Sequence, residues 1–249
     1  MLAIIGGTGL SELDCFESLG SELIPTPYSK QDVRVQLCQH HGQKFAFLPR
    51  HGKDHKVPPH RINYRANIWA LHQLSMTNII AVNAVGGIHG ELGPGAFAVP
   101  NQIIDYSSGR EATFHDQDVD GVRHIDFTVP YDQRLREFLL NVCSNGKIPG
   151  TKVMDGGVYG CTNGPRLESA AEIERMRRDG CDMVGMTGMP EAALAREAGI
   201  AYATLALSVN WAAGIGADVI TMDEIQRVLD TGVGQIKSIL KAVVSATVT

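Results

Sequence analysis

Apolar residues recur along the chain in two patterns that predict alternating strands and helices. Short runs of consecutive apolar residues are typical of strands that are covered on both faces of a sheet. Such runs predict strands at 2–5, 33–37, 44–48, 78–83, 102–104, 152–159 and 201–208. Apolar residues at helical spacing predict helices at about 61–75, 131–142, 169–178 and 223–246, and a further helix that begins at Pro190 and ends at Gly199.

This alternation predicts an α/β fold with a central mixed β-sheet flanked by helices. A chain of 249 residues suits one large domain or two small ones. Because no proline- or serine-rich linker, charge block or internal repeat divides it, we predict a single domain over residues 1–249. Ligands of α/β folds bind at the ends of strands, so motifs placed there are the first candidates for function.

Composition narrows the class of protein. A hydrophobic fraction of 44% suits a sizeable packed core, and a net charge of −5 gives no reason to expect a nucleic-acid partner. The first apolar run is too short for a signal peptide or a membrane anchor. The five cysteines are scattered and form neither a disulfide framework nor a CxxC metal site. We therefore expect a cytoplasmic protein with reduced thiols and no membrane partner.

A glycine cluster directly follows the first predicted strand. The segment Gly6-Gly7-Thr8-Gly9 brings bare backbone N–H groups and one hydroxyl to a strand end, which suits an anion. A dinucleotide-binding GxGxxG pattern would need glycine at position 12, where Glu12 stands. The cluster therefore favours a loop for a small anion, with a purely structural turn as the alternative.

A basic segment, PRHGKDH at 49–55, follows the third predicted strand. Arg50 offers a planar fork that suits an oxyanion, and His51 stands beside it. A zinc site of His51, His55 and His60 is one alternative, although the spacing is irregular and no acidic or cysteine ligand stands in register. A solvated basic loop without a function is the other alternative.

Four further motifs fall at strand ends or helix starts. NAVGG at 83–87 exposes backbone amides, GPRLES at 164–169 and GMTGMPE at 185–191 precede predicted helices, and Asn210 ends an apolar run. Each also has a purely structural interpretation, such as a helix cap at Thr187 or a turn at Asn210.

Taken together and in this order, the motifs resemble the trimeric purine nucleoside phosphorylase and methylthioadenosine phosphorylase family. The resemblance runs from IIGGTGL at the amino terminus to about residue 245, and its most specific stretches are GGTG, RHGxxH, NYRANIWAL, GPRxES and MTGMPEAALAREAGI. It implies a pentosyltransferase in which inorganic phosphate attacks C1′ of a purine nucleoside and releases the base. It also implies a homotrimer that needs no cofactor or metal, with phosphate as a co-substrate.

The resemblance implies a phosphate subsite and two catalytic residues. The phosphate-binding residues, carried over position by position, are Thr8, Arg50, His51, Asn83, Ala84 and Thr187. Family members usually have a hydroxyl or an aromatic residue where Asn83 stands, so we expect its contact through the backbone amide. Met186 matches the methionine beneath the sugar. Because phosphate is a weak nucleophile, positioning and charge stabilisation must supply catalysis, and we assign catalytic roles to His51 and Asn210.

Two positions discriminate between purine bases. The resemblance places Glu168 where 6-oxopurine-specific members carry Glu, and Asn210 and Ala212 where adenine-specific members carry Asp. A Glu168 carboxylate accepts from N1–H of a 6-oxopurine and the Asn210 amide donates to O6 or N7, whereas adenine reverses both roles. Ser169 and Trp211 are expected to line the same subsite. The predicted base is hypoxanthine.

The sugar end is predicted to hold a 5′-methylthio group. Members that use ordinary nucleosides have a histidine at the position that carries Met222 here, and an apolar thioether suits a methylthio group. His55 and, from a neighbouring subunit, His124 match residues at this end in methylthioadenosine phosphorylases. The predicted substrate is therefore 5′-methylthioinosine. Methylthio-type relatives continue beyond the position of residue 249 with a segment that closes this end of the pocket. Without that segment, we expect a more open pocket that accepts inosine or guanosine as well.

Three other functions stay open on the sequence. Two are a general inosine and guanosine phosphorylase and a methylthioadenosine phosphorylase. The third, of a different class, is a non-catalytic nucleoside- or phosphate-binding protein. The intact set of Thr8, Arg50, His51 and Thr187 argues against it.

Overall fold

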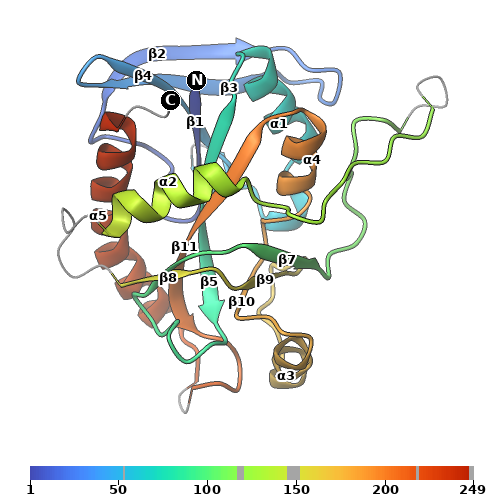
Figure 1. Ribbon diagram of the computed structural model, residues 1–249, viewed down its shortest axis with the longest axis vertical. Coiled ribbons are helices and arrows are strands. Elements are labelled where there is room, and N and C mark those ends of the chain that lie inside the picture. The colour runs from blue at the N-terminus through green and yellow to red at the C-terminus, as the bar shows by residue number, and fades with distance from the viewer. Residues whose placement is uncertain (53, 117–120, 145–151, 217–218, 247–249) are drawn as a thin grey trace.

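The computed structural model describes residues 1–52, 54–116, 121–144, 152–216 and 219–246. A mixed sheet lies at the centre, with helices on both sides (Figure 1). Its strands are β1 (Leu2–Gly6), β2 (Glu17–Ile24), β3 (Val33–His40), β4 (Gln43–Pro49), β5 (Asn78–Gly87), β6 (Phe97–Val99), β7 (Gln102–Asp105), β8 (Val153–Asp155), β9 (Val158–Cys161), β10 (Met183–Gly185) and β11 (Ala201–Trp211). The helices are α1 (Tyr64–Gln73), α2 (Gln133–Ser144), α3 (Ala170–Arg178), α4 (Glu191–Glu197) and α5 (Met222–Ser245), with a 3₁₀ turn at Pro59–Arg61.

The strand pairing confirms the predicted α/β class with a central mixed sheet. The main path runs β2-β3-β4-β1-β5-β10-β9-β7, and β11 pairs with β5 on a branch that continues to β6 and β8. The pairs β4–β1, β1–β5 and β5–β11 are parallel, whereas β2–β3–β4 and β10–β5 are antiparallel. The parallel core therefore brings the carboxyl ends of β4, β1, β5 and β11 to one edge.

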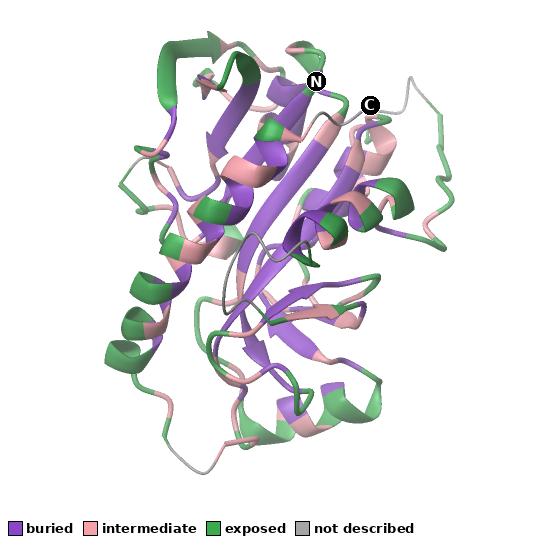
Figure 2. Cartoon of the chain, turned by 60° about the vertical axis from the view of Figure 1, so that its left-hand side comes forward, coloured by how far each residue is buried: buried purple, intermediate pink, exposed green. Residues whose placement is uncertain are grey.

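Alternate side chains of the central strands enter two separate cores. Leu2 and Ile4 of β1 pack with α2 and α5, whereas Ala3 and Ile5 pack with α1 and α4 on the other face. Figure 2 shows the resulting pattern, with buried strands in the middle and exposed outer faces on the helices. Both faces of the parallel core are covered, which explains why its strands read as continuous apolar runs.

One predicted strand is wrong in its extent. The run 152–159 forms two short strands, β8 and β9, which pair in different parts of the sheet: β8 with β6, and β9 with β7 and β10. Between them Gly156 and Gly157 have φ values of +91° and +100°, a backbone conformation that ends a strand. The segment Asp155-Gly156-Gly157 interrupts the apolar run at this point, and its Gly-Gly pair is the turn signal that marks the division.

Three strands were not predicted, and two helices begin later than predicted. β2 is an exposed edge strand with mostly polar residues, and β6 and β10 have only three residues each. α1 begins at Tyr64 because the Asn63 side chain accepts a hydrogen bond from the Ala66 backbone and caps the helix. α2 begins at Gln133, and Tyr131 before it is buried in the core instead.

No helix in the described part of the chain is long and apolar enough to span a bilayer. All five cysteines are free thiols, and four of them are buried.

Candidate functional site

A cavity of about 320 Å³ opens at the edge where the parallel strands end. The cavity is lined by residues from the ends of β1 and β4, the carboxyl-terminal part of β5, β10 and the turn after it, the end of β11, the loop before α3 and the first turns of α5. Eleven of the predicted site residues line it: Thr8, Arg50, His51, His55, Ala84, Glu168, Met186, Thr187, Asn210, Ala212 and Met222. Segments more than two hundred residues apart in sequence, such as those of Thr8 and Met222, thus meet at one site.

The glycine cluster forms a tight turn at the end of β1. The Leu10 backbone N–H donates to the Gly7 carbonyl at 3.0 Å, and Gly9 has φ +82°, as the third position of such a turn requires. A Cβ atom on Gly7 would lie 2.4 Å from the Val82 carbonyl oxygen and 3.1 Å from Arg50 Nη1. The structural turn and the anion loop are therefore compatible, because the turn brings Thr8 to the cavity beside the Arg50 guanidinium.

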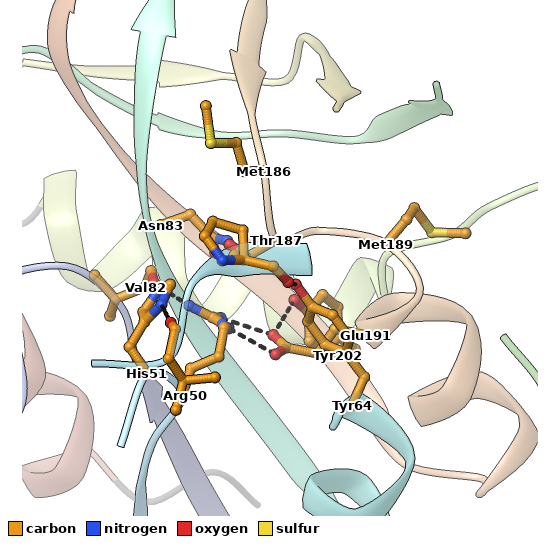
Figure 3. Close-up of polar contacts among 12 residues, drawn as sticks. Arg50, His51, Tyr64, Val82, Asn83, Met186, Thr187, Met189, Glu191 and Tyr202 are labelled. Atoms are coloured by element: carbon orange, nitrogen blue, oxygen red, sulfur yellow. Dashed lines mark hydrogen bonds and ion pairs between the residues drawn. The ribbon is translucent and has the colours of Figure 1, made fainter. Parts of the chain in front are cut away.

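Arg50 is held by a buried bidentate ion pair. Its Nε and Nη2 each donate to a carboxylate oxygen of Glu191 at 2.7 Å, and Nη1 donates to the Val82 carbonyl at 3.1 Å (Figure 3). Both charged side chains are fully buried. One N–H on each terminal nitrogen remains for a ligand, because the guanidinium has five N–H bonds in a fixed plane.

A third hydrogen bond stabilises the Glu191 carboxylate. The Tyr202 hydroxyl donates to Glu191 Oε1 at 2.8 Å from the adjacent strand β11. Burial on its own lowers the pKa of Arg50, but the charge and hydrogen bonds of Glu191 outweigh it and raise the pKa above its ordinary value. Burial and the neighbouring Glu191 raise the pKa of Tyr202. Arg50 therefore stays charged and Tyr202 stays a donor.

His51 is neutral, and its tautomer is set by the backbone. Its Nδ1 lies 2.8 Å from the Val57 carbonyl oxygen, which can only accept, so Nδ1 carries the proton and Nε2 has a lone pair. Burial, and then the charge of Arg50, lower the pKa of His51 to about 4. The His55 ring lies against it with centroids 4.4 Å apart.

Asn83 lies behind the cavity and contacts Thr187. Its Nδ2 donates to Thr187 Oγ1 at 2.7 Å, so Oγ1 is the acceptor and this contact does not use the hydroxyl hydrogen. Asn83 is 1% exposed, and its own Oδ1 has no partner. The side chain therefore orients a hydroxyl that lines the cavity rather than lining the cavity itself.

The cavity lining also includes a carboxylate acceptor and an amide. Thr162 Oγ1 donates to Glu168 Oε1 at 2.6 Å, so the second oxygen, Oε2, is available to a ligand donor. Asn210 follows a bulge in β11 and donates through Nδ2 to the Trp211 carbonyl at 2.6 Å. A carboxylate and an amide thus face the same space.

The remaining predicted residues lie at the mouth of the cavity or outside it. Met222 is the first residue of α5 and is 70% exposed. Ser169 caps α3, where its side chain accepts from the Glu172 backbone, and the Trp211 ring lies against Gly93 and Gly216. His124 is exposed in the segment between β7 and α2, away from the cavity lining of this chain. In the described residues no three His, Cys, Asp or Glu side chains gather as metal ligands.

Sequence reasoning missed Glu191, Tyr202 and Arg110. Glu191 follows a proline at the start of a helix, where an acidic residue is ordinary, and Tyr202 belongs to an apolar strand. Arg110 stands in a segment without a regular pattern. A glutamate that ends the motif GMTGMPE was the one available signal for the partner of Arg50.

The fold and the cavity together define an α/β protein whose parallel strands end at a cavity lined by a buried arginine, a carboxylate and an amide. The model of the phosphorylase superfamily matches residues 1–245. The chain belongs to the phosphorylase superfamily, and it is an enzyme of the purine nucleoside phosphorylase type, a pentosyltransferase.

Three relatives illustrate the similarity. The chain is 52% identical over 244 residues to a probable S-methyl-5'-thioinosine phosphorylase of Pseudomonas syringae pv. tomato, with 98% of each chain covered. It is 43% identical over 229 residues to a 6-oxopurine nucleoside phosphorylase of Pyrococcus furiosus, which covers 90% of this chain and 84% of the relative. A methylthioadenosine phosphorylase from Schistosoma mansoni in complex with adenine superposes with a TM-score of 0.91 and 32% identity, over 98% of this chain and 90% of that one.

Replacing Glu191 by glutamine is expected to destabilise the protein by about 3–5 kcal/mol, because it leaves the buried Arg50 charge uncompensated. Denaturant unfolding measures this change. The matched control is Glu197→Gln on the same helix; Glu197 accepts hydrogen bonds from Thr113 Oγ1 and the Phe114 backbone and has no ion pair with any described residue. The control is expected to cost about 1 kcal/mol or less. Equal unfolding midpoints for both variants would show that the ion pair does not support the fold.

His51 is expected to stay neutral in the free protein at all pH values well above about 4. Its pKa is below the ordinary 6.5, so the unfolded chain binds more protons between these values. The stability that His51 contributes is therefore present above pH 6.5 and is lost as the pH falls through about 4. Imidazole ¹⁵N spectra over a pH titration test this, with the Nδ1–H tautomer expected throughout. Titration near the ordinary value, or an Nε2–H tautomer, would contradict it.

Proposed function

We propose that this enzyme catalyses the phosphorolysis of S-methyl-5′-thioinosine to hypoxanthine and 5-methylthioribose 1-phosphate, a step of purine salvage. The observation that carries the proposal is that Glu168 and Asn210 line the same cavity as Arg50 and Thr187. The 52% identity to a probable S-methyl-5'-thioinosine phosphorylase supports it. No cofactor or metal takes part, and inorganic phosphate is the co-substrate.

Phosphate binds among Thr8, the remaining Arg50 N–H groups, the Thr187 hydroxyl and the backbone at Asn83 and Ala84. Glu191 and Asn83 orient two of these donors before the ligand arrives. Preorganised donors favour one position of the anion, from which an oxygen can reach C1′ of the sugar above Met186. His51 accepts a hydrogen bond from a protonated phosphate oxygen through Nε2.

The base subsite selects a 6-oxopurine by hydrogen-bond direction. Glu168 Oε2 accepts from N1–H, while the Asn210 amide turns from the Trp211 carbonyl to donate to O6 or N7. As the bond from C1′ to N9 breaks, negative charge flows into the ring, and this donor stabilises it. Adenine would place a lone pair against the carboxylate, which costs on the order of 1–3 kcal/mol. Ser169, Trp211 and Ala212 complete this region of the site.

A wider specificity for inosine and guanosine is the second candidate function. Met222 is an apolar residue suited to a methylthio group, but it is 70% exposed at the mouth of the cavity. The similarity to the 6-oxopurine nucleoside phosphorylase of Pyrococcus furiosus points the same way. Met222 and His55 are the residues of this chain that we place near the 5′ substituent.

We propose a homotrimer in which His124 of a neighbouring subunit reaches the sugar end. The segment that carries it exposes apolar side chains, Val122 at 84%, Ile125 at 36% and Val129 at 47%, as a surface for a second copy would. Light scattering distinguishes a trimer from a monomer. A cytoplasmic location accords with the five free thiols.

A substrate panel tests the proposed function. Purified enzyme is given S-methyl-5′-thioinosine, S-methyl-5′-thioadenosine, inosine or guanosine, with and without phosphate, and base release is measured. Hypoxanthine release from the thioinosine is expected to be fastest and to require phosphate. Release without phosphate would overturn the phosphorylase assignment, and faster turnover of the thioadenosine would overturn the proposed roles of Glu168 and Asn210.

Asn210→Asp is expected to shift the ratio of kcat/KM toward the thioadenosine by roughly 10- to 100-fold, because the new carboxylate accepts from the 6-amino group. The ratio is used because a change in stability affects both substrates equally. The control, Asn210→Ala, removes the donor without adding an acceptor and should slow the thioinosine with no gain for the thioadenosine. An unchanged ratio in the aspartate variant would show that this side chain does not contact the base.

A further inference from the structure

Arg110 lies between two segments that contribute to the cavity lining, the loop before α3 and the turn after β10. Its Nη2 donates to the carbonyl oxygens of Thr162 at 3.1 Å, Asn163 at 3.2 Å and Met186 at 2.9 Å. Its Nη1 donates to the Met189 carbonyl. The first two carbonyls belong to the loop that leads to Glu168, and the other two flank Thr187. One guanidinium therefore joins the loop of the base carboxylate to the turn of the phosphate hydroxyl.

The surroundings of Arg110 favour this geometry over an ordinary ion pair. No carboxylate in the described part of the chain lies within ion-pair distance of its guanidinium. The guanidinium lies over the Tyr64 ring at 5.3 Å, and Nη1 also reaches the Tyr64 hydroxyl at 3.3 Å. Helix α1 thus fixes the position of the side chain while backbone carbonyls accept from its two terminal nitrogens; the buried Nε has no partner among the described residues. A planar fork can reach several carbonyls at once, which a lysine cannot.

Each joined loop reaches the substrate through one further contact. On the base side, Thr162 also donates to Glu168 through its hydroxyl, so a shift of Thr162 moves the carboxylate. On the other side, Met186 and Thr187 themselves line the cavity. Arg110 itself does not line the cavity. Its hydrogen bonds go to backbone carbonyls and to the Tyr64 hydroxyl, and Tyr64 does not line the cavity either.

We propose that Arg110 is a positioning residue that sets the separation between the base subsite and the phosphate subsite. This inference rests on the proposed function, because it assumes that Glu168 contacts the base and Thr187 the phosphate. Attack of phosphate on C1′ needs both partners placed to a fraction of an ångström. A residue that holds both loops governs both co-substrates, whereas Glu168 or Thr187 governs one.

The test compares Arg110→Met and Arg110→Lys with a matched control, Arg65→Met. Arg65 anchors the same segment through ion pairs with Glu111 and Asp116, but it reaches neither of the two loops. The measurements are KM and kcat for each co-substrate and calorimetric Kd values for phosphate alone and hypoxanthine alone, all well below the melting temperature. A merely structural role lowers the active fraction and kcat per total protein and leaves KM and Kd unchanged.

Arg110→Met is expected to weaken both Kd values and to lower kcat/KM for both co-substrates by about 10- to 100-fold. Arg110→Lys keeps the charge without the fork and should recover only part of this loss, and it carries the test if the methionine variant does not fold. Arg65→Met should leave both KM values unchanged. An effect on one co-substrate alone, or full recovery with lysine, would overturn the inference. Base release without phosphate in the wild type would instead overturn the proposed function, so the two failures are distinguishable.

Discussion

The buried ion pair between Arg50 and Glu191 is the interaction on which the rest of the site depends. It joins the end of β4 to the start of α4, segments that are 141 residues apart in the chain. Burying two charges is costly unless geometry and further hydrogen bonds compensate, and here the Val82 carbonyl and the Tyr202 hydroxyl supply them. The pair fixes the plane of the guanidinium and with it the direction of the N–H groups left for an anion. Gly7 permits this arrangement because a side chain there would collide with Val82 and crowd Arg50.

The same pair shapes the charge of the anion subsite. Among the described residues that line the cavity, Arg50 is the only lysine or arginine, and Glu191 neutralises it. His51 is neutral because burial and the Arg50 charge lower its pKa. In the proposed function, affinity for phosphate therefore comes from directed hydrogen bonds rather than from excess positive charge. This makes the orientation of each donor decisive, and it explains why Asn83 engages Thr187 from behind the cavity.

Local patterns predicted the parts of the structure that depend on sequence neighbours. The apolar runs predicted the central strands, and the motifs at strand ends named Thr8, Arg50 and Thr187, which do meet at one cavity. Contacts between distant segments are not indicated by the local sequence pattern. Glu191 looked like an ordinary helix-start residue, and nothing near Arg110 in sequence indicates the four carbonyls that it joins. The exposed polar strand β2 likewise forms only because β3 offers it an edge.

The proposed anion side and the proposed base side of the site are built on different structural elements, so substrate specificity can change on one side alone. The anion side is built on the ends of parallel strands and on a buried network that includes Arg50 and Glu191, so changes there disturb the core. The base side is built on the loop before α3 and on the bulged end of β11, where Glu168 and Asn210 are only partly buried. Substitutions at these two positions can reverse donors and acceptors without touching the ion pair. One fold can therefore serve relatives named for 6-oxopurine nucleosides and for methylthioadenosine.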